Sequence, residues 1–596
     1  MKQETKQENI LTVDVAIIGA GWYGLAAART YLKLQPTVKL LIIDSDSTVG
    51  GVWSKARLYP NLVAQVKLGL FNYTDKPMRP HRGDPRDPRV TGEMIHGYLQ
   101  EYAEDHDLVR RIRFNTFVEA ATRCDRGWRL ALRSSDDVVE TQKLLVATGV
   151  TSIPFMPNLA ATSADPIPLI HSKDLGSLYD KVSDPGVQDV VVVGAAKSAY
   201  DAVYLLLTMG KQVTWLIREQ GGGPLAILPF EILRLVNTIA FASTRLMTHL
   251  SPSILNTQGA AYWFFQRTFI GLWLVSLFWK FLDRVSGVHA GYGAGDHVQM
   301  LTPEIDRTHA DHRHSVFWAH SGLGVVTLPN FWATLHGKSL TILRDEIKSL
   351  GRDSVVLKSG VTRSADLVVM CTGWADHFTM FDADQKAMIG LPEYGADTYS
   401  SKSDVEATRS SSTVDWESYD RAADREVDAR LPFLASRPKL KFASRLDPRT
   451  QKKWRLYKRA VPVEMALKGD RSLVVLGQIH TIQTPLLSEV QSLWAIRYLQ
   501  GELPMPDADA MATEVALWNA WTRKRYLNQG QKFPYSLYDF MPYIDSLFED
   551  LGLNSRRKTN PVSEMLAPYR PCDFKGFVDE YMGQGQQERA KPEKKG

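Results

Sequence analysis

The chain has 596 residues, which is too long for one ordinary hydrophobic core and predicts two or more domains. Its 44% hydrophobic and 23% charged residues are typical of a globular protein and exclude a fibrous or largely disordered chain. With 71 basic and 66 acidic side chains the net charge is only +5, and no basic stripe alternates with aromatics, so nucleic acid is excluded as an expected partner.

The cysteines and the N-terminus bear on the cellular compartment. Cys124, Cys371 and Cys572 stand far apart and form no C-x-x-C pair, which argues against dithiol chemistry and a zinc ribbon and suits a reducing compartment. The first residues, MKQETKQENILTVD, lack the apolar core of a signal peptide. We therefore expect a cytoplasmic protein, with association with a membrane surface as an alternative.

A dinucleotide-binding fingerprint stands near the N-terminus. An apolar strand over residues 13–18 runs directly into GAGWYG, and a helix with small residues at its start follows. In this frame Gly19 permits the tight turn, Gly21 lets backbone amides approach a pyrophosphate, and Gly24 lets helix and strand pack closely. The next strand ends at Asp44, whose carboxylate would bind a ribose 2′-hydroxyl and repel a 2′-phosphate. This unit is therefore predicted to bind NAD or FAD, and not NADPH.

A second unit repeats this order of elements with an altered fingerprint. A valine-rich strand leads into GAAKSAYDA, in which Gly194 keeps the first glycine and Ala196 replaces the second. The methyl group of Ala196 is expected to weaken or reposition the pyrophosphate contact without abolishing it. Lys197 and Ser198 add a charge and a hydroxyl at the N-terminus of the following helix.

The next strand identifies the nucleotide of the second unit. Arg218 stands about where Asp44 stands in the first unit. A basic residue there accommodates a 2′-phosphate, and the planar guanidinium suits a bidentate contact with it. The second unit is therefore predicted to bind NADPH. A structural arginine at an exposed strand end is the alternative.

An unusually apolar insert covers about residues 225–284. The segment LAILPFEILRLVNTIAFASTRLM has helical spacing, and residues 261–282 approach the roughly 20 residues of a membrane span. A single crossing would place strands of one domain on opposite sides of the membrane. We expect a buried or substrate-covering helical insert, and peripheral contact with a membrane interface or a two-helix hairpin span are the alternatives.

Two polar segments follow the insert. HADHRH contains His309, His312 and His314, but its spacing lacks a second ligand pair, so we expect a polar loop and no metal. Residues 401–430 begin serine-rich and are predicted to be a surface excursion that becomes helical, and residues 581–596 a polar tail.

Several segments resemble the flavin-containing monooxygenase family. STVGGVWSKARLYPNLVAQ resembles its G-G-x-W segment, and VATGVTSIPFMPNL, ADLVVMCTGW and LVVLGQIHTIQTPLLSEVQSLWAIRYL resemble later motifs. The chain is thus identified as a divergent member, and the resemblance implies FAD in the first unit and NADPH in the second. The residues that it adds to the cofactor sites are Gly51, Val52, Trp53, Gly149 and Gly373.

The resemblance also implies the fold. The class is α/β, with two Rossmann-like dinucleotide-binding domains, the NADPH domain being inserted in a discontinuous FAD domain and carrying the helical apolar insert. We expect the FAD domain over residues 1–180 and 365–580, and the NADPH domain over 181–364. His171 keeps part of a family motif and is expected to fix the linker between the domains.

The activity implied is that of a monooxygenase using FAD, NADPH and dioxygen. In this family a flavin C4a-hydroperoxide delivers one oxygen atom to the substrate, and water must be kept away from it. Gln65 stands where the family usually has an asparagine beside flavin and nicotinamide, so it is the candidate catalytic residue, and a structural role is equally open. The apolar insert favours a small lipophilic substrate, with a role in specialised (secondary) metabolism.

Two other functions stay open. An FAD-dependent dehydrogenase or oxidase on the same scaffold is the first alternative, because Gln65 places its amide one methylene further out than asparagine and could fail to protect the oxygen adduct. A catalytically silent nucleotide-binding protein, attached to a membrane or sensing redox state, is the second.

Overall fold

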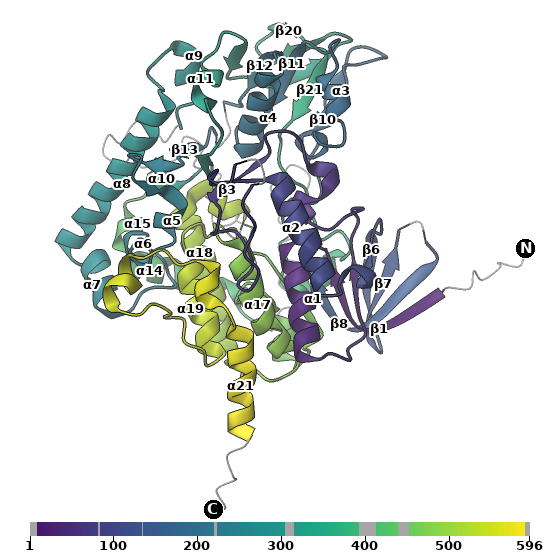
Figure 1. Cartoon of the computed structure of the whole chain (residues 1–596), viewed down its shortest axis with the longest axis vertical. Helices are drawn as coiled ribbons and strands as arrows, with labels where there is room; N and C mark the ends of the chain where they lie inside the picture. Colours follow the sequence, from purple (N-terminus) through teal and green to yellow (C-terminus); the bar gives the residue numbers. More distant parts are fainter. Residues whose placement is uncertain are drawn as a thin grey trace, which may run out of the picture.

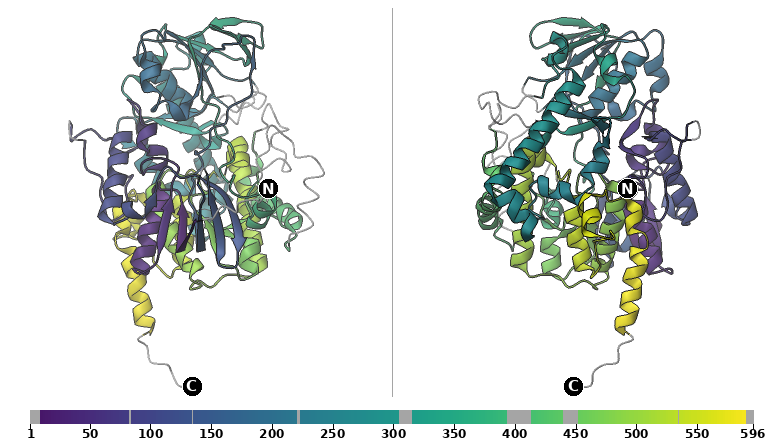
Figure 2. Two further views of the ribbon diagram at one scale, coloured as in Figure 1. Left: turned by 90° about the vertical axis from the view of Figure 1, so that its right-hand side faces the viewer. Right: turned by 60° about the vertical axis from the view of Figure 1, so that its left-hand side comes forward.

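A computed structural model describes residues 9–81, 84–133, 135–219, 223–303, 315–392, 413–438, 452–533 and 535–589. Two sheets built mainly of parallel strands organise the molecule, and Figures 1 and 2 show them one above the other. The longer helices are α1 (Trp22–Leu34), α2 (Gly92–Asp105), α4 (Lys197–Thr208), α8 (Phe269–Ala290), α14 (Trp416–Arg430), α17 (Thr484–Leu499), α18 (Ala508–Lys532), α19 (Phe540–Asp550) and α21 (Phe577–Arg589). The α/β class is confirmed.

The first sheet has seven strands and is assembled from distant parts of the chain. Its order is β5 (Ile112–Arg113), β2 (Leu40–Ile43), β1 (Asn9–Ile18), β8 (Asp137–Val146), β7 (Gly127–Leu132) and β6 (Val118–Cys124), with β24 (Leu473–Val475) also paired to β8. The pairs of β1 with β2 and β8, of β2 with β5 and of β24 with β8 are parallel. The return of the chain to this sheet at β24 makes the first unit discontinuous, as predicted.

The second sheet has five parallel strands. Their order is β10 (Leu169–His171), β21 (Leu367–Met370), β11 (Asp189–Val193), β12 (Gln212–Leu216) and β17 (Leu340–Leu343). The predicted limits at residues 180 and 364 assign β10 and β21 to the FAD domain, and this assignment is wrong for both strands. The four buried residues of β21 pair with β11 on one side and β10 on the other. A wholly apolar strand fits the centre of any parallel sheet, so its sequence does not say which sheet it joins.

Smaller sheets complete the two units. A four-stranded sheet contains β20 (Thr362–Ser364), β19 (Ser354–Leu357), β18 (Ile347–Leu350) and β9 (Ala160–Ala161), and two-stranded pairs are formed by β3 (Val63–Lys67) with β4 (Arg89–Thr91) and by β22 (Leu456–Tyr457) with β23 (Val461–Pro462). Helix α17 packs on α1, and every residue from Pro485 to Leu499 is buried. This helix is therefore a central core element of the first unit.

The apolar insert is helical only in part. Its first residues form β13 (Ala226–Pro229), which pairs in parallel with β16 (Leu323–Val326), and a hairpin of β14 (Glu231–Ile232) and β15 (Val236–Asn237) follows. The helices are α5 (Thr238–Ala242), α6 (Arg245–Leu250), α7 (Gly259–Arg267) and α8. The helical prediction for the start of the insert is wrong, because Leu233 and Arg234 adopt positive φ and β16 supplies a ladder partner. Across the described ranges, no helix combines the length and apolarity needed to cross a membrane.

Both polar segments contain helices where the structure describes them. Residues 401–412 lie outside the described residues. From Trp416 onward the predicted surface excursion is the helix α14, as expected, which packs on α18 through the buried side chains of Ala423 and Val427. The predicted polar tail begins inside α21, which continues to Arg589. Both helices bury a few apolar side chains among many polar ones, so composition alone favours an exposed segment. The histidines of HADHRH lie outside the described residues.

Candidate functional site

The first glycine turn is held by close backbone contacts. Gly19 has a φ of +110°, and a Cβ atom there would lie 2.4 Å from the carbonyl oxygen of Ala147 at the end of β8. A Cβ atom on Gly24 would lie 1.8 Å from the carbonyl oxygen of Gly19. Both positions therefore exclude a side chain, which lets α1 begin directly against the ends of β1 and β8.

The N-terminus of α1 is open to an anion. Gly21 is its N-cap residue in an extended conformation, and no side chain caps the helix. The three atoms nearest to a Cβ built on Gly21 are backbone atoms of Gly51 and Gly50, the closest being the Cα of Gly51 at 3.6 Å, so a glycine backbone and no side chain stands against this position. The turn Gly51–Trp53 approaches from the other side, and Gly50 N donates to Ala20 O at 3.0 Å. Free amides and this facing glycine loop fit a dinucleotide pyrophosphate.

Asp44 lies beside this turn, as the spacing predicts. Its carboxylate accepts from Ala20 N at 2.5 Å and from Asp46 N at 2.8 Å, which fixes its orientation at the end of β2. Burial raises the pKa of Asp44, and these two backbone hydrogen bonds oppose that rise. At the end of β8, Gly149 has a φ of +67°, and within the described residues the buried hydroxyl of Thr148 has no hydrogen-bond partner. These groups fit the adenosine half of FAD.

The remaining predicted residues of the first unit are more peripheral. Val52 is 45% exposed and Trp53 is half-buried, so neither side chain is part of the hydrophobic core of the protein without its cofactor. Sequence reasoning missed Arg57, whose Nη1 donates to Thr151 O at 2.9 Å and whose Nε lies 3.5 Å from the Asp46 carboxylate. It also missed Lys173, which donates to Ser152 O at 2.8 Å. Arg57 stands four positions after Trp53, the last residue of the G-G-x-W segment. Inspection of the residues that directly follow this segment could therefore have identified it as a candidate.

The second glycine turn repeats the geometry of the first. Gly194 has a φ of +141°, and a Cβ atom there would lie 2.4 Å from the carbonyl oxygen of Cys371. Trp215 Nε1 donates to Gly194 O at 2.7 Å. Gly373 follows Cys371 just beyond β21, a strand of the second sheet, whereas the sequence prediction places it in the second part of the FAD domain. Its carbonyl oxygen accepts from Phe155 N at 3.0 Å, in the segment after β8. Short apolar strands ending in similar V-A-T-G and M-C-T-G runs explain why sequence alone assigned both to one domain.

Ala196 occupies the place that Gly21 has in the first unit. It is the N-cap of α4 with φ −96° and ψ −177°, against −87° and −165° for Gly21. Any residue adopts this extended conformation, so the methyl group causes no backbone strain there. Ser198 is exposed, whereas Lys197 forms an ion pair with Asp201 one turn along α4. The positive charge predicted for Lys197 is thus partly neutralised.

Arg218 lies two residues beyond β12 and is exposed. Gly194 N donates to Leu216 O at 3.1 Å, so the end of β12 lies directly beside the glycine turn. Arg218 is therefore within two residues of the turn that would hold a pyrophosphate. The first turn carries the buried carboxylate of Asp44 in the corresponding position, and the two turns differ in charge at the place where ribose substituents are distinguished.

Gln65 connects the first unit to β16, the strand that pairs with β13 of the apolar insert. It lies on β3, and its Oε1 accepts from Val325 N on β16 at 2.7 Å. Its amide oxygen is therefore used within the protein, and its NH2 group is the part that can serve a ligand.

His171 lies at the end of β10 and contacts the turn that follows β21, the neighbouring strand of the second sheet. Its expected role in fixing the linker between the domains stays a prediction. Its Nδ1 accepts from Lys173 N at 3.1 Å, so Nε2 carries the proton and donates to Gly373 O at 3.1 Å. The imidazole also packs edge-on against Trp374, with ring centroids 5.0 Å apart. Burial lowers the pKa of His171, which favours this neutral form. The ring therefore holds the end of β10 against the turn that follows β21.

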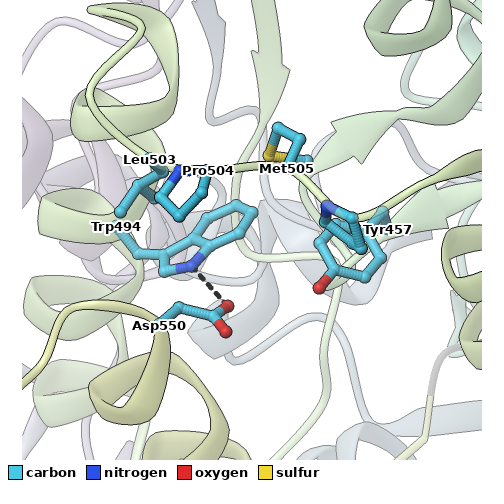
Figure 3. Close-up of a pocket in the computed structure, with 7 residues that line it drawn as sticks. Tyr457, Trp494, Leu503, Pro504, Met505 and Asp550 are labelled. Atoms are coloured by element: carbon cyan, nitrogen blue, oxygen red, sulfur yellow. Dashed lines mark hydrogen bonds between the residues drawn. The ribbon is translucent and has the colours of Figure 1, made fainter.

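A cavity of about 320 Å³ is lined by residues that belong to neither glycine turn. Figure 3 shows it between Trp494 on α17, the loop after that helix and Asp550 at the end of α19, with the indole of Trp494 donating to Asp550 at 2.9 Å. Trp494 is ten residues from the start of α17, or about 15 Å along the helix axis. None of the residues predicted for the cofactor sites lines this cavity.

Comparison with known proteins relates the chain to oxidoreductases along its whole length. The family described as pyridine nucleotide-disulphide oxidoreductase matches residues 16–225. The FAD-dependent monooxygenase DEP4 of Fusarium langsethiae is 39% identical over 582 residues, covering 97% of this chain and 96% of that protein. The FAD-dependent monooxygenase rstn6 of Aspergillus nomiae is 39% identical over 587 residues, covering 96% and 98%. The closed crystal structure of cyclohexanone monooxygenase shares the fold with a TM-score of 0.55 at 15% identity, covering 91% of this chain and 97% of that one.

Proposed function

We propose that this chain, which belongs to the family of FAD-dependent monooxygenases, takes its electrons from NADPH and inserts one oxygen atom of dioxygen into a small lipophilic substrate. As a member of that family it is a flavin-dependent oxidoreductase with FAD as cofactor. The choice of NADPH is supported by one contrast, the acidic Asp44 beside the first turn and the basic Arg218 beside the second.

The protein's own contribution is to hold and orient two nucleotides. Bound FAD supplies hydride acceptance and dioxygen activation, which the side chains cannot provide. The free amides of α1 and the Gly51 loop would hold the FAD pyrophosphate, and Asp44 its ribose. The amides of α4 would hold the second pyrophosphate, and Arg218 would bind the 2′-phosphate.

The alternative is an oxidase or dehydrogenase that does not transfer oxygen. The observation behind it is the hydrogen bond from Val325 N to Gln65 Oε1, which is the contact of a structural residue. The two functions separate when NADPH-reduced holoprotein is mixed rapidly with dioxygen. A monooxygenase should show a persistent flavin absorption distinct from the oxidised and reduced spectra. Direct return to oxidised flavin with release of hydrogen peroxide would establish the alternative.

Replacement of Gln65 distinguishes its donor group from its acceptor group. Gln65→Glu keeps an oxygen for Val325 N but removes the NH2 donor, whereas Gln65→Ala removes both. If the amide donates to the oxygen-activating site, both variants should shorten the lifetime of the persistent absorption by roughly tenfold or more, the effect of losing one hydrogen bond of about 1.5 kcal/mol. A loss in Gln65→Ala alone would show that Gln65 serves only to join β3 and β16.

Arg218→Ala tests the nucleotide assignment. Loss of a charge-assisted phosphate contact should raise the KM for NADPH by roughly 10- to 100-fold and leave the KM for NADH within about twofold. Stopped-flow reduction of the flavin with each nucleotide provides the measurement. Arg352→Ala, at an exposed arginine in the turn between β18 and β19, is the matched control and should change neither value. Equal increases for NADPH and NADH would remove Arg218 from this role.

A further inference from the structure

Exposed aromatic side chains are concentrated on two helices of the insert. Among the described residues, all the exposed Trp and Phe side chains lie on α7 and α8, and Phe269, Trp263 and Trp273 are 84%, 62% and 56% exposed. We name this surface the α7–α8 face. Its apolar members are Trp263, Phe264, Phe269, Ile270, Trp273, Leu277, Phe281 and Val288. In Figure 1 these helices lie along one outer edge of the molecule.

The exposed side chains form one stripe of a well-anchored helix. On α8 the exposed apolar residues after Ile270 follow at steps of three, four, four and seven, which keeps them on one side of the helix, and the opposite side is buried. There Trp279 Nε1 donates to Leu250 O at 2.8 Å and Ser286 Oγ donates to Ile227 O at 2.7 Å. The rotation of α8 about its axis is thus fixed, and the apolar stripe is directed outward by these contacts.

The two helices are locked together as one surface. A Cβ atom on Gly271 would lie 1.9 Å from the carbonyl oxygen of Phe264, so α7 and α8 meet at backbone distance. Thr268 Oγ1 accepts from Gly271 N at 3.0 Å and donates to Phe264 O at 2.7 Å. Tyr262 Oη donates to Arg430 O at 2.7 Å, which ties α7 to the end of α14. The α7–α8 face is therefore held in a fixed shape.

The charges on this face have one sign. Lys280 and Arg284 are exposed one turn apart, and among the described residues neither has a carboxylate partner within ion-pair distance. The acidic residue of these helices, Asp283, accepts from Val316 N at 2.9 Å and is held toward the protein by that bond. Aromatic and aliphatic side chains beside unpaired Lys and Arg are the composition of helices that lie in a membrane interface.

We propose that the α7–α8 face is a docking surface for an anionic lipid bilayer, with both helices lying in the plane of the interface. The apolar stripe enters the acyl boundary, and Lys280 and Arg284 contact lipid headgroups. A second copy of the chain fits this face less well. In a two-fold interface the same patch meets itself, and the two cations would oppose their own copies.

The docking surface lies close to the candidate oxygen-transfer region. The buried side of α8 packs on β13, β13 pairs with β16, and β16 binds Gln65 through Val325 N. This consequence rests on the proposed function, because a lipophilic substrate dissolved in the bilayer would then meet the enzyme on the side nearest Gln65. Docking itself does not depend on turnover.

Vesicle co-sedimentation of the FAD-loaded protein tests the proposal. Vesicles of phosphatidylglycerol and phosphatidylcholine should bind the wild type more tightly than pure phosphatidylcholine. Trp273→Glu should lower the partition coefficient on both vesicle types by about tenfold or more. Lys280→Ala and Arg284→Ala should each lower it by about fivefold on anionic vesicles only. Val361→Glu, at a 41% exposed valine between β19 and β20, should bind as the wild type does.

Three results would overturn the proposal. These are no binding of the wild type to anionic vesicles, unchanged binding of Trp273→Glu, and a wild-type dimer in lipid-free solution that Trp273→Glu converts to a monomer. The last result would assign the face to a second copy. The flavin-to-protein absorbance ratio of each variant shows whether it is folded. Since binding is measured without NADPH or substrate, failure of docking is distinguishable from failure of the proposed oxygen transfer.

Discussion

Gly24→Ala should produce a protein that no longer retains FAD. The new methyl group would lie 1.8 Å from the carbonyl oxygen of Gly19, which is backbone and cannot move aside as a flexible side chain would. The first turn of α1 must then shift away from the amide positions that face the pyrophosphate. We expect the dissociation constant for FAD to rise by roughly a hundredfold, equivalent to about 3 kcal/mol. Fluorescence titration of the deflavinated protein with FAD measures it.

A helical glycine in open space is the matched control for Gly24. Gly97 lies in α2, and no atom lies within 4 Å of a Cβ atom built there. Gly97→Ala should leave FAD affinity unchanged and stabilise the protein by about 0.5–1 kcal/mol, because alanine loses less backbone entropy in a helix than glycine. Normal FAD retention by Gly24→Ala would show that the turn at Gly19 does not hold the cofactor.

Gly194→Ala should separate the two nucleotide sites. Its φ of +141° is unfavourable for alanine, and the methyl group would lie 2.4 Å from the carbonyl oxygen of Cys371. The two effects together distort the second turn. We expect the free energy of NADPH binding to become less favourable by about 3 kcal/mol, which corresponds to roughly a hundredfold weaker binding. The FAD content should stay at the wild-type level, because the first turn lies on the other sheet. Flavin absorbance and the NADPH dependence of flavin reduction give both values.

Gly360 supplies the control for the backbone conformation at Gly194. It has a φ of +90°, in the turn between β19 and β20, with no atom within 4 Å of a built Cβ. Gly360→Ala should cost about 1–2 kcal/mol of stability and leave the KM for NADPH unchanged. If Gly194→Ala lost FAD and NADPH together, the two turns would belong to one site.

The amino-acid sequence by itself determined the two glycine turns and their local partners. Gly19, Gly24, Asp44 and Gly194 lie where the fingerprint spacing predicts, because each turn is a strand, a glycine and a helix N-terminus within about 25 consecutive residues. The chain-wide motifs likewise identified the family. Steric contacts between residues this close in the chain depend only on residue type and spacing, so no contact with a distant segment is needed to specify them.

Only the tertiary structure decided which distant segments meet. It placed β10, β21 and Gly373 with the second sheet and joined Gln65 to Val325 across 260 positions of the chain. It also set the outward rotation of α8 through the hydrogen bonds of Trp279 and Ser286. A buried strand or an apolar helix could pack equally well against several apolar surfaces of the protein. Its own residues therefore do not determine which of these surfaces it contacts. That choice depends on long-range pairing and packing across the whole fold.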